Sequence, residues 1–211
     1  MTKLKNERDI EEQNQPAPVI RESVFMPITK DQIFAEFISF RHLSDNNEHL
    51  AICFGSWRNQ AAPMVRIHSE CLIGDVFLSA KCDCGTQLEE GIQLLSKIGG
   101  IILYLREEGR GLGLYNRLDT YALQNEGVDN HFAGSLLQFK ENLRSYQPAA
   151  EMLEALGAKN IKLLTNNPVK ATQLERFGIK IKEIRSTGNS RKPILWTLLD
   201  APVQKCYQNS F

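Results

Sequence analysis

Three cysteines, Cys71, Cys82 and Cys84, lie close together in a chain that has only five, in the pattern Cys-x10-Cys-x-Cys. Thiolates are favoured zinc ligands. Structural zinc sites usually have four protein ligands, whereas catalytic sites have three and keep one position for water or substrate. The spacing therefore predicts a zinc ion with an open coordination position. Two alternatives remain: Cys71 is an ordinary buried residue and the close pair is incidental, or His68 is a fourth ligand.

A zinc ion with an open position lowers the pKa of bound water to near neutrality and so supplies a hydroxide nucleophile. Such a nucleophile suits hydrolysis at an electrophilic carbon, including a ring carbon between two nitrogens. Zinc-dependent nucleobase chemistry also uses a carboxylate that carries protons, and Glu70 and Asp83 are candidates for this role. In an extended chain the side chains of Cys82 and Cys84 would point apart, so we expect a turn there, which Gly85 would permit.

Two turns rich in glycine or asparagine are candidates for holding an anion. The run Glu107-Glu-Gly-Arg-Gly-Leu-Gly113 lies between an expected strand and an expected helix, where backbone N–H groups and a helix N-terminus attract oxyanions. It matches neither of the standard phosphate-binding motifs, but Arg110 can donate two hydrogen bonds to a phosphate. The run Thr165-Asn-Asn-Pro-Val-Lys170 is similar, although by itself a helix cap is the simpler interpretation. Beside a metal cluster, the two turns together fit a nucleotide whose phosphates contact basic donors.

The apolar pattern predicts strands first and alternating helices and strands afterwards. Strands are expected over residues 34–40, 49–55, 64–67, 100–105, 161–164 and 179–184. Helices are expected over residues 86–98, 148–157 and 168–177, and another helix is expected to follow Gly113 and to end at about residue 126. Thr86 is expected to cap the first helix. This order indicates an α+β or mixed α/β domain, with a β-rich N-terminal part followed by helices and strands around a central sheet. Residues 1–19 are expected to be a flexible tail and residues 20–211 a single domain.

Composition narrows the choice of partner and compartment. The formal net charge is zero, which gives no reason to expect nucleic acid or an anionic membrane as a partner. No apolar run reaches the roughly 18 residues of a transmembrane helix, and the first residues lack the apolar core of a secretory signal. We therefore expect a cytoplasmic protein whose cysteines stay reduced and are available for metal binding or catalysis.

Several motifs, taken together and in order, closely resemble the GTP cyclohydrolase II family, whose members begin riboflavin synthesis. The resemblance covers about residues 65–184 and implies a homodimer. The motifs that carry it are Arg66-Ile-His-Ser-Glu-Cys71, Lys81-Cys-Asp-Cys-Gly-Thr-Gln87, Arg106-Glu-Glu-Gly-Arg-Gly-Leu-Gly-Leu114, Tyr121-Ala-Leu-Gln124 and Leu163-Leu-Thr-Asn-Asn-Pro168.

The resemblance also implies site residues and a reaction. Cys71, Cys82 and Cys84 would bind one zinc ion per subunit, and Mg²⁺ would assist with the phosphates of GTP. Hydroxide supplied at the zinc ion would open the guanine imidazole ring at C8 and release formate, close to Tyr121. Arg144 would attack the α-phosphate and expel pyrophosphate, leaving a diaminopyrimidinone ribosyl phosphate. The residues that would bind GTP are Arg66, Ile67, His68, Ser69, Glu70, Gln87, Glu108, Gly109, Arg110, Asn130, Thr165 and Lys170.

Asn142 is the main departure from the family. The family pattern at this point is Asp-x-Arg, with the aspartate as proton acceptor, whereas this chain has Asn142-Leu-Arg144. An amide cannot act as a general base at neutral pH. Asn130 replaces a family threonine and retains hydrogen bonding. Two functions follow: a GTP cyclohydrolase II that releases formate and pyrophosphate, or a diverged GTP-binding paralogue with partial or no activity. A non-catalytic zinc-stabilised nucleotide-binding module fits the cysteines but leaves Gln87, Tyr121 and Arg144 without a role.

Overall fold

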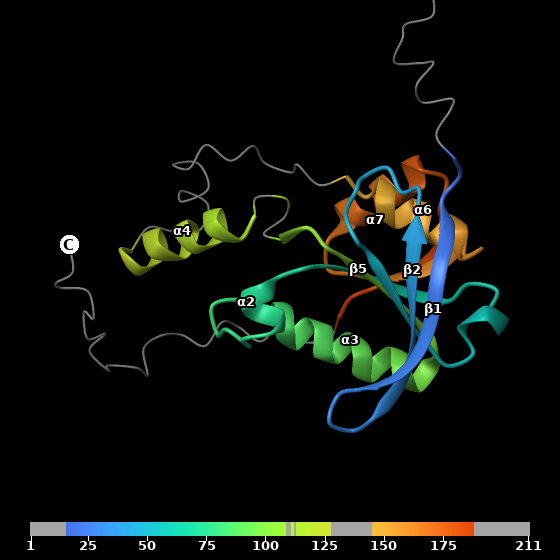
Figure 1. Ribbon diagram of the computed structural model, residues 1–211, viewed down its shortest axis with the longest axis horizontal. Coiled ribbons are helices and arrows are strands. Elements are labelled where there is room, and N and C mark those ends of the chain that lie inside the picture. Colours follow the sequence, from blue (N-terminus) through green and yellow to red (C-terminus); the bar gives the residue numbers. More distant parts are fainter. Residues whose placement is uncertain (1–15, 109–110, 112, 128–144, 188–211) are drawn as a thin grey trace, which may run out of the picture.

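The computed structural model describes residues 16–108, 111, 113–127 and 145–187. They form a seven-stranded mixed sheet with helices on both faces (Figure 1), which confirms the predicted mixed α/β class. The strands are β1 (Val19–Ile28), β2 (Ile33–Arg41), β3 (Leu50–Phe54), β4 (Met64–Ser69), β5 (Gly100–Leu105), β6 (Asn160–Leu164) and β7 (Lys180–Arg185). The helices are α2 (Leu72–Asp75), α3 (Cys84–Ile98), α4 (Leu114–Asn125), α6 (Gln147–Ala155), α7 (Pro168–Arg176) and the 3₁₀ turn η2 (Trp57–Asn59).

The order of strands in the sheet is β1-β2-β3-β5-β4-β6-β7. The first four strands in this order pair antiparallel, and they come mainly from the β-rich N-terminal part. The pairs β5–β4, β4–β6 and β6–β7 are parallel, as expected where helices connect successive strands. The β-rich N-terminal part thus supplies the antiparallel strands β1, β2 and β3, whereas its last strand, β4, lies in the parallel part between β5 and β6.

Strand β5 is buried because both faces of the sheet are covered. Along this strand alternate side chains point to opposite faces. Leu103 packs on the face that also receives Met152 of α6 and Leu174 of α7, and Ile102 packs on the face that receives Leu95 of α3. Figure 1 shows α3 on one side of the sheet and α6 and α7 on the other. This two-sided packing explains why residues 100–105 are an apolar run without polar alternation.

Three local features differ from the expectations drawn from the sequence. The predicted Thr86 cap is wrong, because α3 begins two residues earlier at Cys84 with Asp83 as its N-cap. Strand β1 was not expected. It is an edge strand that contains Pro27, and its side chains are mostly exposed, so it lacks the pattern of a buried face. The four-residue helix α2 is too short to give a periodic signal.

None of the described helices is both long and apolar enough to cross a lipid bilayer.

The carboxyl ends of β4, β5 and β6 meet at one edge of the sheet. The chain leaves β4 toward α2, leaves β5 toward α4, and leaves β6 toward α7. Strand β4 lies between β5 and β6. The connection after β4 leads to α3 on one face of the sheet, and the connection after β6 leads to α7 on the other face. In open α/β sheets the crevice beyond such a reversal of strand order is the usual place for a ligand. The fold therefore brings the segments after residues 69, 105 and 164 to a common edge.

Candidate active site

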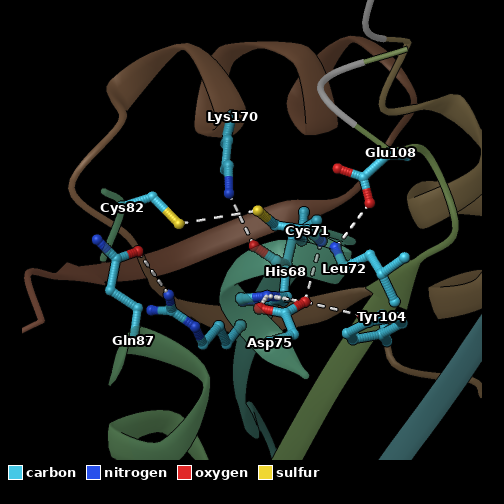
Figure 2. Close-up of polar contacts among 11 residues, drawn as sticks. His68, Cys71, Leu72, Asp75, Cys82, Gln87, Tyr104, Glu108 and Lys170 are labelled. Atoms are coloured by element: carbon cyan, nitrogen blue, oxygen red, sulfur yellow. Dashed lines mark hydrogen bonds and ion pairs between the residues drawn. The ribbon is translucent and has the colours of Figure 1, made fainter. Parts of the chain in front are cut away.

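The three clustered cysteines converge at the carboxyl edge of the sheet. Cys71 follows β4 and precedes α2, and Cys84 is the first residue of α3, with Cys82 in the loop before it. Their sulfur atoms all lie within 4.8 Å of one another, and the Cys71 and Cys82 sulfurs are 3.8 Å apart (Figure 2). The start of α3 at Cys84 turns the chain out of the extended conformation, so the two side chains of the Cys-x-Cys pair can face the same point.

Two glycines make room for this convergence. A Cβ on Gly74 of α2 would lie 2.7 Å from the Cys82 sulfur and 3.3 Å from the Cys71 sulfur. A Cβ on Gly85 of α3 would lie 2.2 Å from the carbonyl oxygen of Gly74. Gly85 does not have a positive φ, so the predicted turn, which is the start of α3, does not depend on a backbone conformation that only glycine adopts. Gly85 instead allows the backbones of α2 and α3 to approach each other closely.

The ionisation of the cysteines indicates that the cluster suits a cation. Hydrogen bonds from Cys71 and Cys84 lower the pKa of Cys82. The hydrogen bond with Cys82 raises the pKa of Cys71, and Cys71 and Cys82 together raise that of Cys84. The thiols alone therefore stabilise one thiolate at the expense of the other two. A divalent metal would remove this conflict, because its charge stabilises all three thiolates. Soft sulfur donors at this separation fit zinc.

Asp75, at the end of α2, holds the residues around the cysteines in place. Its carboxylate lies 3.0 Å from Nε2 of His68, accepts the Tyr104 hydroxyl at 2.8 Å and accepts the backbone N–H of Cys71 at 3.0 Å (Figure 2). Burial acts to raise the pKa of Asp75, but these partners, His68 foremost, outweigh burial and lower it. His68 also stacks on the Tyr104 ring. His68 thus pairs with a carboxylate and is not part of the cysteine group.

A cavity of about 450 Å³ opens beside the cysteines. Among the residues predicted to bind GTP, eight contribute to its wall, and they come from β4, α3 and the segment from the end of β6 into α7. The lining residues are Arg66, Ile67, His68, Ser69, Glu70, Cys71, Lys81, Cys82, Asp83, Cys84, Gln87, Arg117, Leu164, Thr165, Asn166, Asn167, Lys170 and Thr187.

Arg66 and Gln87 form the wall between β4 and α3. An Nη atom of Arg66 donates to the Gln87 side-chain oxygen at 3.1 Å (Figure 2), whereas its Nε is buried without a partner among the described residues. Burial lowers the pKa of Arg66, although a guanidinium stays charged at neutral pH. A Cβ on Gly91 would lie 2.8 Å from the Arg66 side chain, so this glycine lets the arginine run along α3. The free Nε–H is available to a ligand with an oxygen or nitrogen acceptor.

The opposite wall is the start of α7. The Asn167 side chain accepts the backbone N–H of Val169 at 3.0 Å, so the interpretation of this turn as a helix cap is confirmed. The hydroxyl of Thr165 accepts the backbone N–H of Asn167 at 3.0 Å. The Lys170 ammonium group donates to the Ile67 carbonyl at 2.7 Å, across the carboxyl edge of the sheet (Figure 2). A positive helix end and an ammonium group therefore face the same cavity as the cysteines.

Tyr121 lies against the cysteine cluster from α4. Its side chain is 7% exposed, and its hydroxyl has no hydrogen-bond partner among the described residues. The Arg117 guanidinium carbon is 4.8 Å from the centroid of the ring, and the Lys81 ammonium is 5.4 Å from it. Burial raises the pKa of Tyr121 to about 12, with the Arg117 cation opposing this rise and the Cys82 sulfur adding to it. Lys81 also donates to the side chain of Asn125, which fastens the loop before α3 to α4.

Of the remaining predicted site residues, Glu70 lines the cavity, Glu108 does not, and the others lie outside the described residues. Glu108 is not among the cavity-lining residues. One of its carboxylate oxygens accepts the backbone N–H of Leu72 at 2.6 Å (Figure 2), and the other is buried without a partner in the described part of the chain. Glu70 lines the cavity and lies 3.5 Å from the Arg106 side chain. The other five predicted site residues lie outside the described residues: Gly109, Arg110, Asn130, Asn142 and Arg144.

Sequence reasoning did not identify Asp75, Arg117 and Asn166. Asp75 lies four residues after Cys71, and a carboxylate there is a signal for a group that fixes the segment around a metal ligand. Arg117 precedes Tyr121 by one helical turn, so its place on the same helix face follows from the predicted helix. Asn166 pairs with Thr187, whose backbone N–H it accepts at 2.9 Å. No sequence signal predicts that pair, because the two residues are far apart in the chain.

Comparisons with known proteins agree with this geometry. The sequence profile of the GTP cyclohydrolase II family matches residues 23–186. The chain is 54% identical over 160 residues to the GTP cyclohydrolase-2 of Vibrio vulnificus, covering 75% of this chain and 81% of that protein. It is 52% identical over 160 residues to the GTP cyclohydrolase-2 of Vibrio cholerae, with the same coverage. It is also 45% identical over 148 residues to the riboflavin biosynthesis protein RibBA of Thermotoga maritima, covering 70% of this chain and 38% of that protein.

The profile match includes both walls of the cavity and all three clustered cysteines, and it spans most of the chain. The identity to the curated relatives is high enough that the same fold and the same class of reaction follow. The chain is therefore an enzyme of the GTP cyclohydrolase II family.

Proposed function

We propose that this enzyme opens the guanine imidazole ring of GTP by zinc-dependent hydrolysis and releases formate and pyrophosphate, as the first step of riboflavin synthesis. The observation that carries the proposal is the convergence of three cysteine sulfurs within 4.8 Å on the wall of a cavity that also contains Arg66, Gln87 and Lys170. The product would be a diaminopyrimidinone ribosyl phosphate.

Cys71, Cys82 and Cys84 would hold one zinc ion. When bound, a zinc ion with an open position supplies hydroxide near neutral pH. Asp75 supports this centre, since it accepts the Cys71 backbone N–H and holds His68 in a fixed orientation. Asp75 thus fixes the backbone of the first cysteine independently of its sulfur.

The nucleotide would lie between the two walls of the cavity. The end near Arg66 and Gln87 offers amide and guanidinium donors for the base, close to the cysteines. The end near Thr165 and Lys170 offers a helix N-terminus and an ammonium group, which favour phosphates. Mg²⁺ would accompany the phosphates, as it usually does in nucleotide sites. In this orientation C8 of the guanine would lie toward the cysteine sulfurs.

Arg144 would expel pyrophosphate. In this step a nitrogen of its guanidinium forms a bond to the α-phosphorus while the bond from that phosphorus to the pyrophosphate oxygen breaks. Water then cleaves the nitrogen–phosphorus bond and frees the nucleotide product. A proton must leave the attacking nitrogen, and Asn142 cannot accept it. This substitution favours a second candidate function, a diverged GTP-binding paralogue with partial or no activity.

One assay separates the two candidates. The zinc-loaded protein is incubated with GTP, and formate, pyrophosphate and the pyrimidine product are each quantified. Matched formate and pyrophosphate support the proposed function. Release of one without the other, or of neither while GTP remains bound, supports the diverged paralogue. Replacing a general base commonly costs about 10²- to 10⁴-fold in rate, so Asn142→Asp should raise turnover if the missing base limits the reaction.

The zinc site has its own test. Cys82→Ser should reduce the bound zinc to well below one ion per chain and abolish formate release. Cys206→Ser is the matched control, because Cys206 lies far from the cluster in sequence. Equal zinc content in Cys82→Ser and the unchanged protein, measured by mass spectrometry of the metal, would contradict the assignment.

We further infer a homodimer that acts in the cytoplasm. Val76, Phe77 and Leu78 are consecutive exposed apolar residues beside the cysteine loop, and contiguous apolar surface of this kind commonly marks an interface. Light scattering during size-exclusion chromatography should give twice the mass of the chain, 23.9 kDa. A Phe77→Lys variant that remains dimeric would place the interface elsewhere.

A further inference from the structure

Arg117 presents an unused hydrogen-bond donor at the cysteine side of the cavity. Its Nε is buried and has no partner among the described residues, although the side chain lines the cavity. The residue lies on α4, which extends away from the sheet (Figure 1), and it reaches the cavity through the same helix face as Tyr121.

The hydroxyl of Tyr121 is a second unused group in the same corner. It is buried and has no partner in the described part of the chain, and the tyrosine side chain is more than nine-tenths buried. A buried donor without an acceptor is unfavourable, because no hydrogen bond compensates for its loss of water. Two such groups side by side therefore point to an acceptor that a ligand supplies.

The charges in this corner define that acceptor. Arg117 is a permanent cation without acceptor atoms, and Lys81 lies over the same tyrosine ring at 5.4 Å. These two cations would repel a cationic ligand, and such a ligand would offer no acceptor to the Arg117 Nε–H. An oxygen that carries negative charge would satisfy both the Nε–H and the tyrosine hydroxyl.

The position of Arg117 separates it from the phosphate end of the cavity. Burial acts to lower the pKa of Arg117, but Tyr121 foremost, and after it the nearby sulfurs of Cys71 and Cys84, outweigh burial and raise it. The ammonium group of Lys170 and the α7 N-terminus face the cavity from another wall. An oxyanion held by Arg117 would thus be formed at the reacting carbon beside the cysteines.

We propose that Arg117 is a further catalytic residue, which together with Tyr121 binds the oxygen on C8 as hydrolysis proceeds; this inference rests on the proposed function. Water adds across the C8–N7 double bond, so that oxygen bonds to C8 and N7 gains a proton. The C8–N9 bond then breaks, N9 takes the hydroxyl proton, and a formamide remains on N7. A second water adds to the formyl carbon, the C8–N7 bond breaks with proton transfer to N7, and formate leaves. Negative charge develops on the C8 oxygen when its hydroxyl loses a proton as the C8–N9 bond breaks, and again on the formyl oxygen when the second water adds. Donors positioned for this oxygen lower the barriers of both steps.

The test compares Arg117→Gln and Arg117→Lys with Asp119→Asn. Asp119 is an exposed charged residue on the same helix, so its variant controls for changes in α4. Removing one oxyanion donor typically costs about 10²- to 10³-fold in kcat. We expect that loss for formate release by Arg117→Gln, with KM for GTP changed less than about threefold and zinc content unchanged. Arg117→Lys retains the charge but not the Nε–H, so its rate of formate release should lie between the rates of Arg117→Gln and Asp119→Asn.

A second substrate isolates the step at C8. The ring-opened nucleotide that carries the formamide should lose formate slowly in Arg117→Gln, and added methylguanidine should restore part of the rate in Arg117→Ala. Such rescue would not occur if the arginine only stabilised α4. Normal formate release by Arg117→Gln, or a rise in KM alone, would overturn the role of Arg117 while leaving the proposed function intact. Absence of formate release by the unchanged protein would instead contradict the proposed function.

Discussion

Nε2 of His68 lies 3.0 Å from the carboxylate of Asp75, and both side chains are buried. The same carboxylate accepts the backbone N–H of Cys71. A single aspartate therefore fixes the histidine on β4 and the first cysteine after β4. The precision of the cysteine cluster depends on this group as well as on the cysteines.

Asp75→Asn tests that dependence. The amide retains an acceptor for the Cys71 N–H but loses the negative charge opposite His68. Changes to groups behind metal ligands typically weaken metal affinity about 10- to 100-fold. We expect a loss in that range for zinc, measured by competition with a chelator. Asp119→Asn serves as the control for charge removal, and equal zinc affinity in the two variants would contradict the role of Asp75.

Gly74→Ala tests the close approach of α2 to the cysteines. The added methyl group would lie 2.7 Å from the Cys82 sulfur, so the sulfur must move. Overpacking of this kind commonly costs about 1–3 kcal/mol. We expect weaker zinc binding together with lower stability in the zinc-loaded state. Measuring unfolding with and without a chelator separates the two effects, and unchanged zinc affinity would show that the cluster tolerates the displacement.

His49 should act as an anchor for the segment that follows β5. Its ring is buried, Nδ1 accepts the backbone N–H of Arg106 at 2.9 Å, and Nε2 donates to Asp45 at 2.9 Å. Asp45, His49 and Glu107 lie close enough to resemble a metal site. The backbone donor on Nδ1 places the ring proton on Nε2, however, so Nε2 has no lone pair for a metal.

His49→Leu leaves the Arg106 N–H without an acceptor and should lower the free energy of unfolding by about 1–3 kcal/mol. His49→Asn is the matched variant, because its side-chain oxygen occupies nearly the position of Nδ1, and it should retain much of that stability. Urea unfolding measures both variants. If the unchanged protein bound a second zinc ion and both variants lost it, the anchor role of His49 would be contradicted.

The interactions of the Glu36 carboxylate should make the protein less stable at acid pH. Its carboxylate accepts Arg58 Nη atoms at 2.6 and 2.9 Å and the Ser23 hydroxyl at 2.6 Å, which connects β1, β2 and η2. Hydrogen bonding by Arg58, with a smaller contribution from Ser23, lowers the pKa of Glu36 below 4.5 despite burial.

The pKa of Glu36 is lower in the folded state than in the unfolded state, so ionised Glu36 stabilises the fold. This stabilisation is complete above about pH 4.5 and is lost as the pH falls through the pKa of Glu36 in the folded state. Glu36→Gln should be less stable than the unchanged protein at pH 7, and the difference should shrink as the solution is acidified. Thermal unfolding measured from pH 7 to pH 3 checks this. A difference that stays constant with pH would mean that the charge of Glu36 is not involved.

Much of the fold could be predicted because its signals are local. The run at 100–105 is apolar without alternation, as expected for a strand with both faces covered, and Pro168 marks the start of α7. Strand β1 gave no such signal, because an exposed edge strand needs no apolar face and takes its conformation from pairing with β2. The close approach of α2 to Gly85 could not be predicted for a related reason: a glycine required by a neighbouring helix is indistinguishable in sequence from one required by a turn.

By itself the sequence determined the ligand types: three thiolates at a spacing suited to zinc, two strand-to-helix turns that suit an anion, and the motifs of the GTP cyclohydrolase II family. Only the tertiary structure decided that the ends of β4, β5 and β6 meet at one edge of the sheet, and that Arg117 and Asp75 lie beside the cysteines. The reason is physical. Residue type fixes which bonds a side chain can form. Which side chains meet depends on strand order and helix packing, and these arise from burial summed over the whole chain.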